Sequence, residues 1–231
     1  MFDIDELSRL YVDIRDCHIC PRMDKSKASR LIQAVDLESD VFIISEALAR
    51  CQLRRSGVNF FDEYGKLGNA GEQLEKFLNK FQRTVYPYLE VATCLNTRIP
   101  KRQPGFLSVY NTEITQCYPG PRRPKGDEIC RCISKGFLIK EIELIKPKLL
   151  LLMGRVSRDS FFQYVLETKH PQSLSEHIDS IVQDGKIPRF SLGCLSLYVL
   201  PIQHASGRNW RRFRSMIEDD SLIDLIRGVL K

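Results

Sequence analysis

The sequence lacks the features that mark membrane, secreted and disordered proteins. No apolar run comes near the roughly 20 residues that a membrane-spanning helix needs. The first six residues are largely acidic, whereas a signal peptide begins with a basic segment and continues with an apolar one. Only 13 residues are glycine and 11 are proline, while 43% are hydrophobic, too much apolar surface for a disordered chain to keep in water. We therefore expect a soluble, cytoplasmic, globular protein, and no internal repeat is visible.

Short apolar runs predict the strands of a central sheet. The run at residues 40–44 is almost uniformly apolar, as a strand covered on both faces must be. Further core strands are expected at residues 108–116, 148–154 and 195–202. Apolar residues at helical spacing predict helices over residues 5–15, 73–81, 127–144, 157–166 and 210–229. Residues 169–185 are polar, and we expect them to form a connection.

Strands that alternate with helices indicate a parallel sheet with helices on both faces. The length of 231 residues suits one such domain. We therefore predict an α/β fold, a three-layer α/β/α arrangement with a central four-stranded parallel sheet. It would form a single domain over residues 1–231, with an inserted segment at about 83–105.

Basic residues are concentrated in a few probable loops. The formal net charge is +6, and Lys and Arg gather at residues 54–55, 101–102, 122–125 and 208–214. A solvated charged face would explain any one of these groups. Four together favour a polyanionic partner such as DNA, because Lys and Arg displace the counterions that phosphates condense.

Several polar residues come at or just after the ends of the predicted strands. Ser45 and Glu46 follow the first strand, Cys117 the second and His204 the last. Ligands of parallel sheets bind at the carboxyl ends of the strands, so these residues are candidates for one site. A histidine after an apolar strand is, by position alone, more often a hydrogen-bonded core residue.

The chain contains eight cysteines, which in an intracellular protein favour metal binding over disulfides. Cys17 and Cys20 form a Cys-x-x-Cys turn, and Cys117 with either Cys130 or Cys132 forms a second pair. Zinc and an iron–sulfur cluster both suit this arrangement. Buried apolar cysteines that bind no metal are the third alternative.

The order and spacing of several motifs resemble the family 4 uracil-DNA glycosylases over nearly the whole length. Those proteins open with a helix and Cys-x-x-Cys-Pro, as residues 17–21 do here. Their strand that ends in a cysteine is similar to residues 109–120, and the following stretch to residues 123–132. Their glycine-rich pocket motif is similar to residues 57–74, and their Pro-x-x-His-Pro-Ser motif to residues 201–206.

The resemblance implies an iron–sulfur protein that repairs DNA by base excision. It implies a [4Fe-4S] cluster as cofactor, and the alignment selects Cys132 rather than Cys130, so the implied ligands are Cys17, Cys20, Cys117 and Cys132. It implies a monomer whose partner is DNA that contains uracil or another deaminated base.

The resemblance also implies a role for several other residues. Enzymes of this kind flip the base out of the stack into a pocket, where Phe60 would stack on it and Glu113 would contact its edge. Glu46 and His204 are the implied catalytic residues, the carboxylate orienting water and the imidazole stabilising the departing base. The implied DNA contacts are Ser206, Arg208, Trp210 and Arg211.

The sequence departs from the family in the motifs closest to the base. The family's first motif, GEAPGExE, is here residues 45–52 without its glycines and proline, and the family's base-reading asparagine corresponds to Glu113. An ionised carboxylate only accepts hydrogen bonds, whereas an amide also donates. Glu113 would have to be protonated, or prefer another base, or be a solvated carboxylate. A protein that binds damaged or single-stranded DNA without cutting it is the alternative function, and an electron-transfer protein a third.

Overall fold

The structure is a computed structural model, and it describes residues 4–20, 39–47, 60–62, 64–92, 96–116, 122–169, 172–205 and 209–231. Its centre is a five-stranded sheet with the order β6-β1-β7-β9-β8. The strands are β1 (Val41–Ala47), β6 (Tyr110–Thr115), β7 (Leu149–Met153), β8 (Arg189–Leu192) and β9 (Leu195–Ile202). The four predicted strands are present and parallel.

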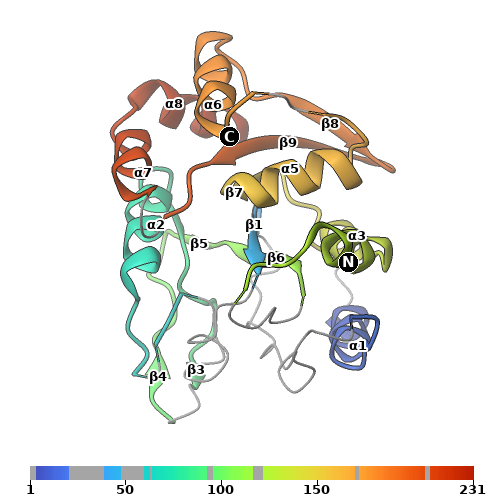
Figure 1. Cartoon of the computed structure of the whole chain (residues 1–231). Coiled ribbons are helices and arrows are strands. Elements are labelled where there is room, and N and C mark those ends of the chain that lie inside the picture. The colour runs from blue at the N-terminus through green and yellow to red at the C-terminus, as the bar shows by residue number, and fades with distance from the viewer. Residues whose placement is uncertain are drawn as a thin grey trace.

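Helices cover both faces of the sheet, so the predicted three-layer α/β/α fold is confirmed (Figure 1). The helices are α1 (Ile4–Arg15), α2 (Asn69–Asn79), α3 (Gly126–Ser134), α4 (Phe137–Ile145), α5 (Arg155–Tyr164), α6 (Leu174–Gln183), α7 (Trp210–Ile217) and α8 (Asp220–Leu230). One apolar core joins the sheet to α2, α6, α7 and α8, and the other joins it to α3, α4 and α5. Within the described ranges, no helix combines the length and apolar character that a membrane crossing requires.

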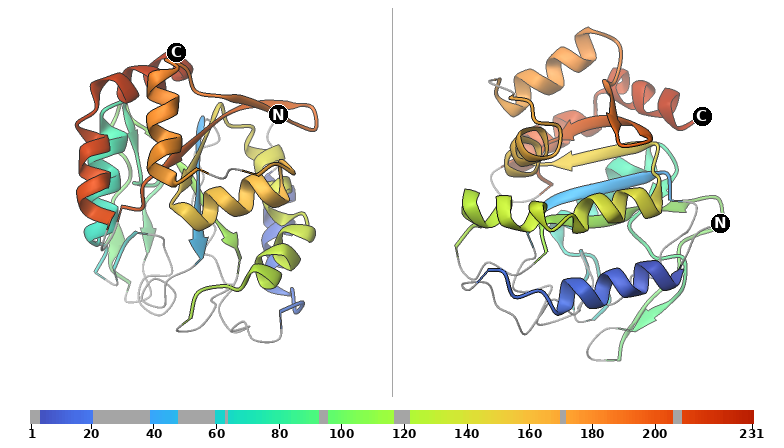
Figure 2. Two further views of the ribbon diagram at one scale, coloured as in Figure 1. Left: turned by 45° about the horizontal axis from the view of Figure 1, so that its top comes forward. Right: turned by 90° about the vertical axis from the view of Figure 1, so that its right-hand side faces the viewer.

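Two predictions about the sheet and its connections were wrong. Residues 169–185 are not only a connection, because they contain α6. Ser173 accepts a hydrogen bond from the amide of Glu176, whose side chain returns to the Ser173 amide, and this capping box starts the helix. The sheet also has a fifth strand, since β8 pairs antiparallel with β9 in a hairpin (Figure 2). Gly193, with φ of +57°, makes the turn between them.

Two of the predicted helices are each divided in two. The helix expected over residues 127–144 breaks between α3 and α4 at Gly136, whose φ is +74°. A left-handed residue cannot continue a right-handed helix, and glycine adopts that conformation at little cost. The helix expected over residues 210–229 breaks at Asp219, whose side chain caps α8 by accepting from the Leu222 amide.

The segment at 83–105 forms small pairings beside the main sheet. Its strands are β2 (Arg83–Thr84), β3 (Val91–Ala92) and β4 (Arg98–Ile99), and β5 (Leu107–Ser108) follows. Strand β2 pairs with β5 in parallel, and β3 pairs with β4 in antiparallel.

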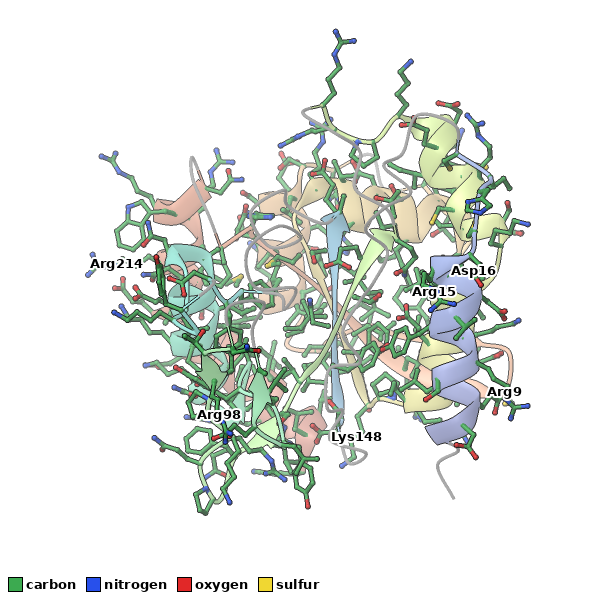
Figure 3. The ribbon with its side chains drawn as sticks, turned by 90° about the horizontal axis from the view of Figure 1, so that it is seen from below. Arg9, Arg15, Asp16, Arg98, Lys148 and Arg214 are labelled. Atoms are coloured by element: carbon green, nitrogen blue, oxygen red, sulfur yellow. The ribbon has the colours of Figure 1, made fainter. Side chains whose placement is uncertain are left out.

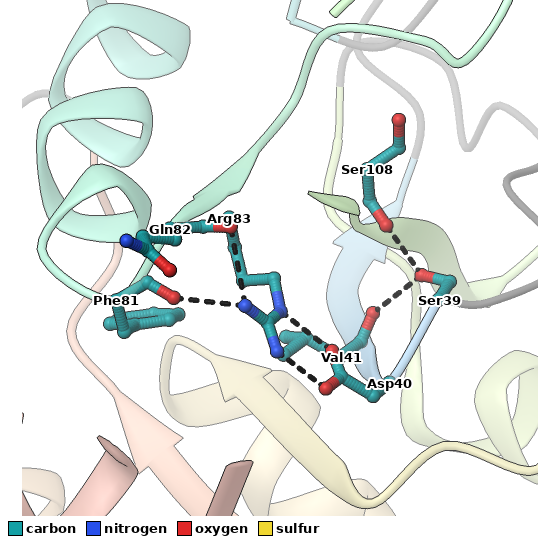
Figure 4. A network of polar contacts seen from close by, with 7 residues as sticks. All are labelled: Ser39, Asp40, Val41, Phe81, Gln82, Arg83 and Ser108. Atoms are coloured by element: carbon teal, nitrogen blue, oxygen red, sulfur yellow. Dashed lines mark hydrogen bonds and ion pairs between the residues drawn. The ribbon is translucent and has the colours of Figure 1, made fainter. Parts of the chain in front are cut away.

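Buried polar contacts fix this segment to the start of β1 (Figure 4). Two nitrogens of Arg83 donate to the Asp40 carboxylate at 2.7 and 2.5 Å, and the Ser39 hydroxyl donates to the Ser108 carbonyl at 2.7 Å. Asp40 immediately precedes β1, so the segment is held at the amino-terminal edge of the sheet. The carboxyl-terminal edge, where ligands of parallel sheets bind, remains on the opposite side.

Candidate functional site

Glu46 and His204 both interact with Arg123 at the carboxyl-terminal edge of the sheet. Glu46 is the penultimate residue of β1, and His204 lies two residues beyond β9. Arg123 interacts with each of them. Its Nε is 3.5 Å from Glu46 Oε1, and its charge lowers the pKa of His204. The Glu46 side chain is 20% exposed, while that of Arg123 is 81% exposed. The edge therefore presents a carboxyl and an imidazole around one solvent-facing cation.

Burial shifts the pKa of both groups towards their neutral forms. It raises the pKa of the Glu46 carboxyl, and Arg123 opposes that rise because a cation favours the ionised form. Burial lowers the pKa of His204, and Arg123 lowers it further. At neutral pH His204 is therefore a neutral imidazole, which has one N–H donor and one acceptor nitrogen.

Gly154 provides the space for the His204 ring. It follows β7 with φ of +89°, and its amide donates to the Ile202 carbonyl at 2.8 Å. A Cβ at this position would lie 3.3 Å from His204 Cδ2. The glycine that closes the third predicted strand is therefore required both by its backbone conformation and by the imidazole beside it.

Glu113 is buried within β6 and is not a solvated carboxylate, so that interpretation was wrong. Its residue is 1% exposed and stands opposite Ser45 in the register of the parallel strands. Neighbouring side chains on a strand alternate between faces. Because Tyr110 and Thr112 bond to Glu141 of α4, Glu113 points to the opposite face, which α2 covers.

Asn111 is a candidate that the sequence analysis missed. It lies two residues before Glu113 and therefore on the same face of β6. It is 6% exposed, and neither atom of its amide has a hydrogen-bond partner among the residues that the structure describes. Buried polar groups are nearly always paired, so an unpaired donor and acceptor together indicate a group that a ligand satisfies. A polar residue within an apolar strand was the signal in the sequence.

Phe60 is held in an unusual backbone conformation against the start of α2. Its φ is +69°, and its carbonyl accepts a hydrogen bond from the Gly68 amide at 2.9 Å. A Cβ at Gly71 would come within 2.9 Å of both Cβ and the carbonyl oxygen of Phe60. Gly71 thus allows the chain at Phe60 to pack directly on the helix, with the ring half-buried against the apolar core of the α2 face.

The cysteines of the predicted ligand set lie around α3, as far as they are described. Cys20 and Cys132 are buried, whereas Cys130 is exposed. Burial raises the pKa of the Cys20 thiol, Arg131 of α3 opposes this effect, and Cys17 adds to it. Cys17 itself packs on the small core between α1 and α4. Cys117 lies outside the described residues, and among those described no three His, Cys, Asp or Glu side chains form a group that could hold a metal.

A hydrogen bond connects the end of β6 to Cys132. The amide of Gln116 donates to Cys132 Sγ at 3.3 Å, and amide donors of this kind are typical around metal-bound thiolates. The Gln116 side chain is held in turn by the buried carboxylate of Glu141, at 3.1 Å. Glu141 also accepts from Tyr110 at 2.8 Å, and Tyr110 shares a 2.6 Å hydrogen bond with Tyr11 of α1. The three segments that carry the predicted ligands are thereby fixed to one another, and the thiol donors fit a soft metal or a cluster.

The predicted DNA contacts are described only in part. Trp210 begins α7, is 40% exposed, and has the Arg214 guanidinium 5.5 Å from its ring centroid. Arg211 is exposed, while Ser206 and Arg208 lie outside the described residues. Arg214 lies on the opposite side of the molecule from Arg15 of α1 (Figure 3). The aromatic and basic start of α7 is therefore well separated from the cysteines that follow α1.

Comparison with known proteins identifies the family of the chain. A search of curated proteins found no match to the chain. The sequence model of the Uracil DNA glycosylase superfamily, in contrast, matches residues 32–225, which include both strands that carry Glu46 and Glu113 as well as His204. The chain belongs to the uracil DNA glycosylase superfamily.

Proposed function

We propose that this protein is a DNA repair glycosylase that hydrolyses the N-glycosidic bond of a deaminated base, with uracil as the first candidate. The observation that carries the proposal is the pairing of Glu46 and His204 around Arg123 at the carboxyl-terminal edge of the sheet. Membership of the superfamily supports glycosylase chemistry on DNA. A flipped base would lie between this pair and the face of β6 that α2 covers.

His204 would stabilise the leaving base. As the bond from the sugar C1′ to the base nitrogen breaks, both electrons go to the base, and negative charge develops on its carbonyl oxygen. A neutral imidazole donates a hydrogen bond to that oxygen without giving up its proton, and burial strengthens the interaction by excluding water. The lowered pKa of His204 suits this role, since the ring is neutral and ready to donate at physiological pH.

Glu46 would act on the sugar. The sugar becomes an oxocarbenium ion as the base departs, and a nearby carboxylate both stabilises the positive charge and orients the water that attacks C1′. Only the ionised form can do so. Arg123 favours that form by opposing the rise that burial causes in the pKa of Glu46.

Phe60, Asn111 and Glu113 would form the pocket for the base. Phe60 would stack on the ring, held in place by the contact with Gly71. The Asn111 amide offers both a donor and an acceptor, the pair that the O4 and N3–H of uracil require. Glu113, where the family has asparagine, would accept from an N–H group of the base.

We further propose that the protein belongs to the branch that carries a [4Fe-4S] cluster, with Cys17, Cys20, Cys117 and Cys132 as ligands. The burial of Cys132 and the amide donated to its sulfur support this, as does the exposure of Cys130. When bound, the cluster would supply structural cross-linking of the segments around α3, not chemistry on the base. Ser206, Arg208, Trp210 and Arg211 would bind the DNA backbone and the opened stack.

A glycosylase assay tests the proposal. Single- and double-stranded oligonucleotides that contain uracil, hypoxanthine or xanthine are incubated with the protein, and abasic sites are cleaved and counted. We expect cleavage of at least the uracil substrate, and a loss of about 100-fold or more in His204→Ala, as for removal of one oxyanion donor. Glu46→Gln removes the carboxylate and should also lose activity. Glu176→Gln, which changes an exposed carboxylate outside the site, is its control and should keep activity. Salt-sensitive DNA binding without cleavage of any substrate would favour the non-catalytic alternative.

A further inference from the structure

A second pocket lies far from Glu46 and His204, between α2 and the segment that follows β4. Its volume is about 280 Å³, and its walls include Glu75, Thr84, Tyr86, Lys101, Gln103 and Phe106. The neighbouring Arg83 is bound to Asp40 at the start of β1, whereas Glu46 lies six residues along the same strand. At about 3.3 Å per residue, about 20 Å of strand separates Asp40 from Glu46. The pocket is therefore separate from the proposed catalytic site.

Hydrogen bonds hold the segments on both sides of this pocket in place. Arg83 is pinned by Asp40 and by the carbonyls of Phe81 and Gln82 (Figure 4). In the segment after β4, the Arg102 amide donates to the Pro87 carbonyl at 2.8 Å, and the Phe106 amide donates to the Gln103 carbonyl at 3.3 Å. Segments held in this way lose little conformational entropy when a ligand binds between them.

The floor of the pocket is a half-buried carboxyl group, Glu75. Oε1 accepts from the Thr84 hydroxyl at 2.8 Å and, in the amide orientation that satisfies both groups, from Asn79 at 3.0 Å. Oε2 accepts only from the Val85 amide at 2.9 Å, within the described part of the chain. Each carboxylate oxygen has two acceptor positions. One position on Oε2 therefore remains for a donor on a ligand.

The other walls combine flat apolar groups with a cation. Phe106 and Tyr86 contribute aromatic rings, and the Tyr86 ring is held edge-on by Phe61 with centroids 5.4 Å apart. Lys101 and Gln103, both exposed, stand at the pocket wall. An aromatic surface suits a planar heterocycle, and a lysine suits a phosphate. The carboxylate at the floor suits an amino group on that heterocycle, as glutamate accepts from cytosine N4.

We propose that this pocket binds a single cytosine nucleotide. The base would pack on Phe106 and Tyr86, its exocyclic amino group would donate to Glu75 Oε2, and its phosphate would pair with Lys101. The volume lies just below the range of about 300–1,000 Å³ typical of small-molecule sites, which favours a pyrimidine over a purine. The site does not depend on glycosylase activity, so its failure and that of the proposed function are distinguishable.

Direct binding of mononucleotides to the full-length protein tests the site. Titration calorimetry compares dCMP with dUMP, which present a donor and an acceptor, respectively, at position 4 of the ring, and an acceptor and a donor at N3. We expect dCMP to bind about tenfold more tightly, the worth of one hydrogen bond gained against one unpaired acceptor. Lys101→Ala would weaken dCMP by about threefold to tenfold through loss of the phosphate contact, and Lys76→Ala, an exposed lysine on α2 outside the pocket, would not.

Further variants separate this pocket from the proposed catalytic site. Glu75→Gln removes the preference for dCMP over dUMP if the protein folds, and the comparison of nucleotides in the wild type remains decisive if it does not. His204→Ala leaves dCMP binding unchanged. A short oligodeoxycytidylate that competes with dCMP would identify a DNA strand as the source of the nucleotide, and one that does not would identify the free nucleotide. Absence of dCMP binding, equal binding of dUMP, or insensitivity to Lys101→Ala would overturn the proposal.

Discussion

Gly154 and His204 approach so closely that a methyl group on Gly154 would lie 3.3 Å from Cδ2 of the imidazole. Gly154 also has φ of +89°, a backbone conformation that residues other than glycine rarely adopt. We therefore predict that Gly154→Ala lowers the free energy of unfolding by about 1–3 kcal/mol and displaces His204, so that glycosylase activity falls as well. Denaturant unfolding and the uracil assay measure the two effects.

Gly185→Ala is the matched control for this variant. Gly185 also has a positive φ, +65°, but nothing lies within 4 Å of a Cβ built there. Its replacement should cost about 1 kcal/mol of backbone strain and leave activity intact. If both variants lose activity to the same extent, the contact with His204 is not what makes Gly154 necessary.

Arg123 should control the acid limb of the pH–rate profile. Its charge lowers the pKa of Glu46, so Arg123→Ala lets that pKa rise further above the ordinary value. Because Glu46 acts as a carboxylate, activity would then be lost at a higher pH. The shift should be small, since an exposed arginine is well screened by water. Arg122→Ala, in the same loop, should leave the limb in place, and an equal shift in both variants would contradict the assignment.

The strands and most helices could be predicted because their signals are local. Strand β7 is buried throughout, and its run of leucines indicates this directly. The breaks at Gly136 and Asp219 were missed because helical spacing of apolar residues continues across them. The fifth strand was missed because β8 is half exposed and gains its partner only through the hairpin with β9. Pairing of this kind depends on tertiary context more than on composition.

The sequence predicted the site residues that follow the ends of strands. It did not predict those whose role depends on tertiary contacts. Glu46 and His204 follow from the order of the parallel strands. The influence of Arg123 on both does not, because it depends on where residues 122–125 lie relative to the strand ends. Asn111 required the alternation of β6 to be known, since only that places it on the Glu113 face.

Asn111→Leu should separate function from stability. The Asn111 amide is buried and has no partner within the described ranges, so an apolar side chain of similar shape removes a donor and an acceptor that these ranges leave unpaired. We predict that the free energy of unfolding stays the same or rises by about 1–2 kcal/mol, while activity on uracil falls by at least about tenfold. A variant that is less stable but fully active would show that the amide serves the fold and not the base.

The Arg83–Asp40 pair should be the anchor of the segment that forms the second pocket. Both side chains are buried, at 10% and 15% exposure, so Asp40→Asn leaves a charge that the interior no longer compensates. We expect a loss of about 2–4 kcal/mol in the free energy of unfolding. Glu90→Gln breaks the exposed Arg98–Glu90 pair and should cost less than about 1 kcal/mol. Similar losses in the two variants would contradict an anchoring role for Arg83.

Cys132 and Cys130 lie two residues apart on α3 and therefore on different sides of the helix. They offer the sharpest test of the proposed cluster. Cys132 is buried and accepts the Gln116 amide, while Cys130 is exposed to solvent. Anaerobically purified Cys130→Ser should keep the brown colour and the iron and sulfide content of the wild type, and Cys132→Ser should lose most of both, because a hydroxyl is a poor replacement for a thiolate ligand. Stoichiometric zinc in a colourless wild-type protein would show that the cysteines bind zinc and not a cluster. Loss of iron in Cys130→Ser but not in Cys132→Ser would show that Cys130, and not Cys132, is the ligand.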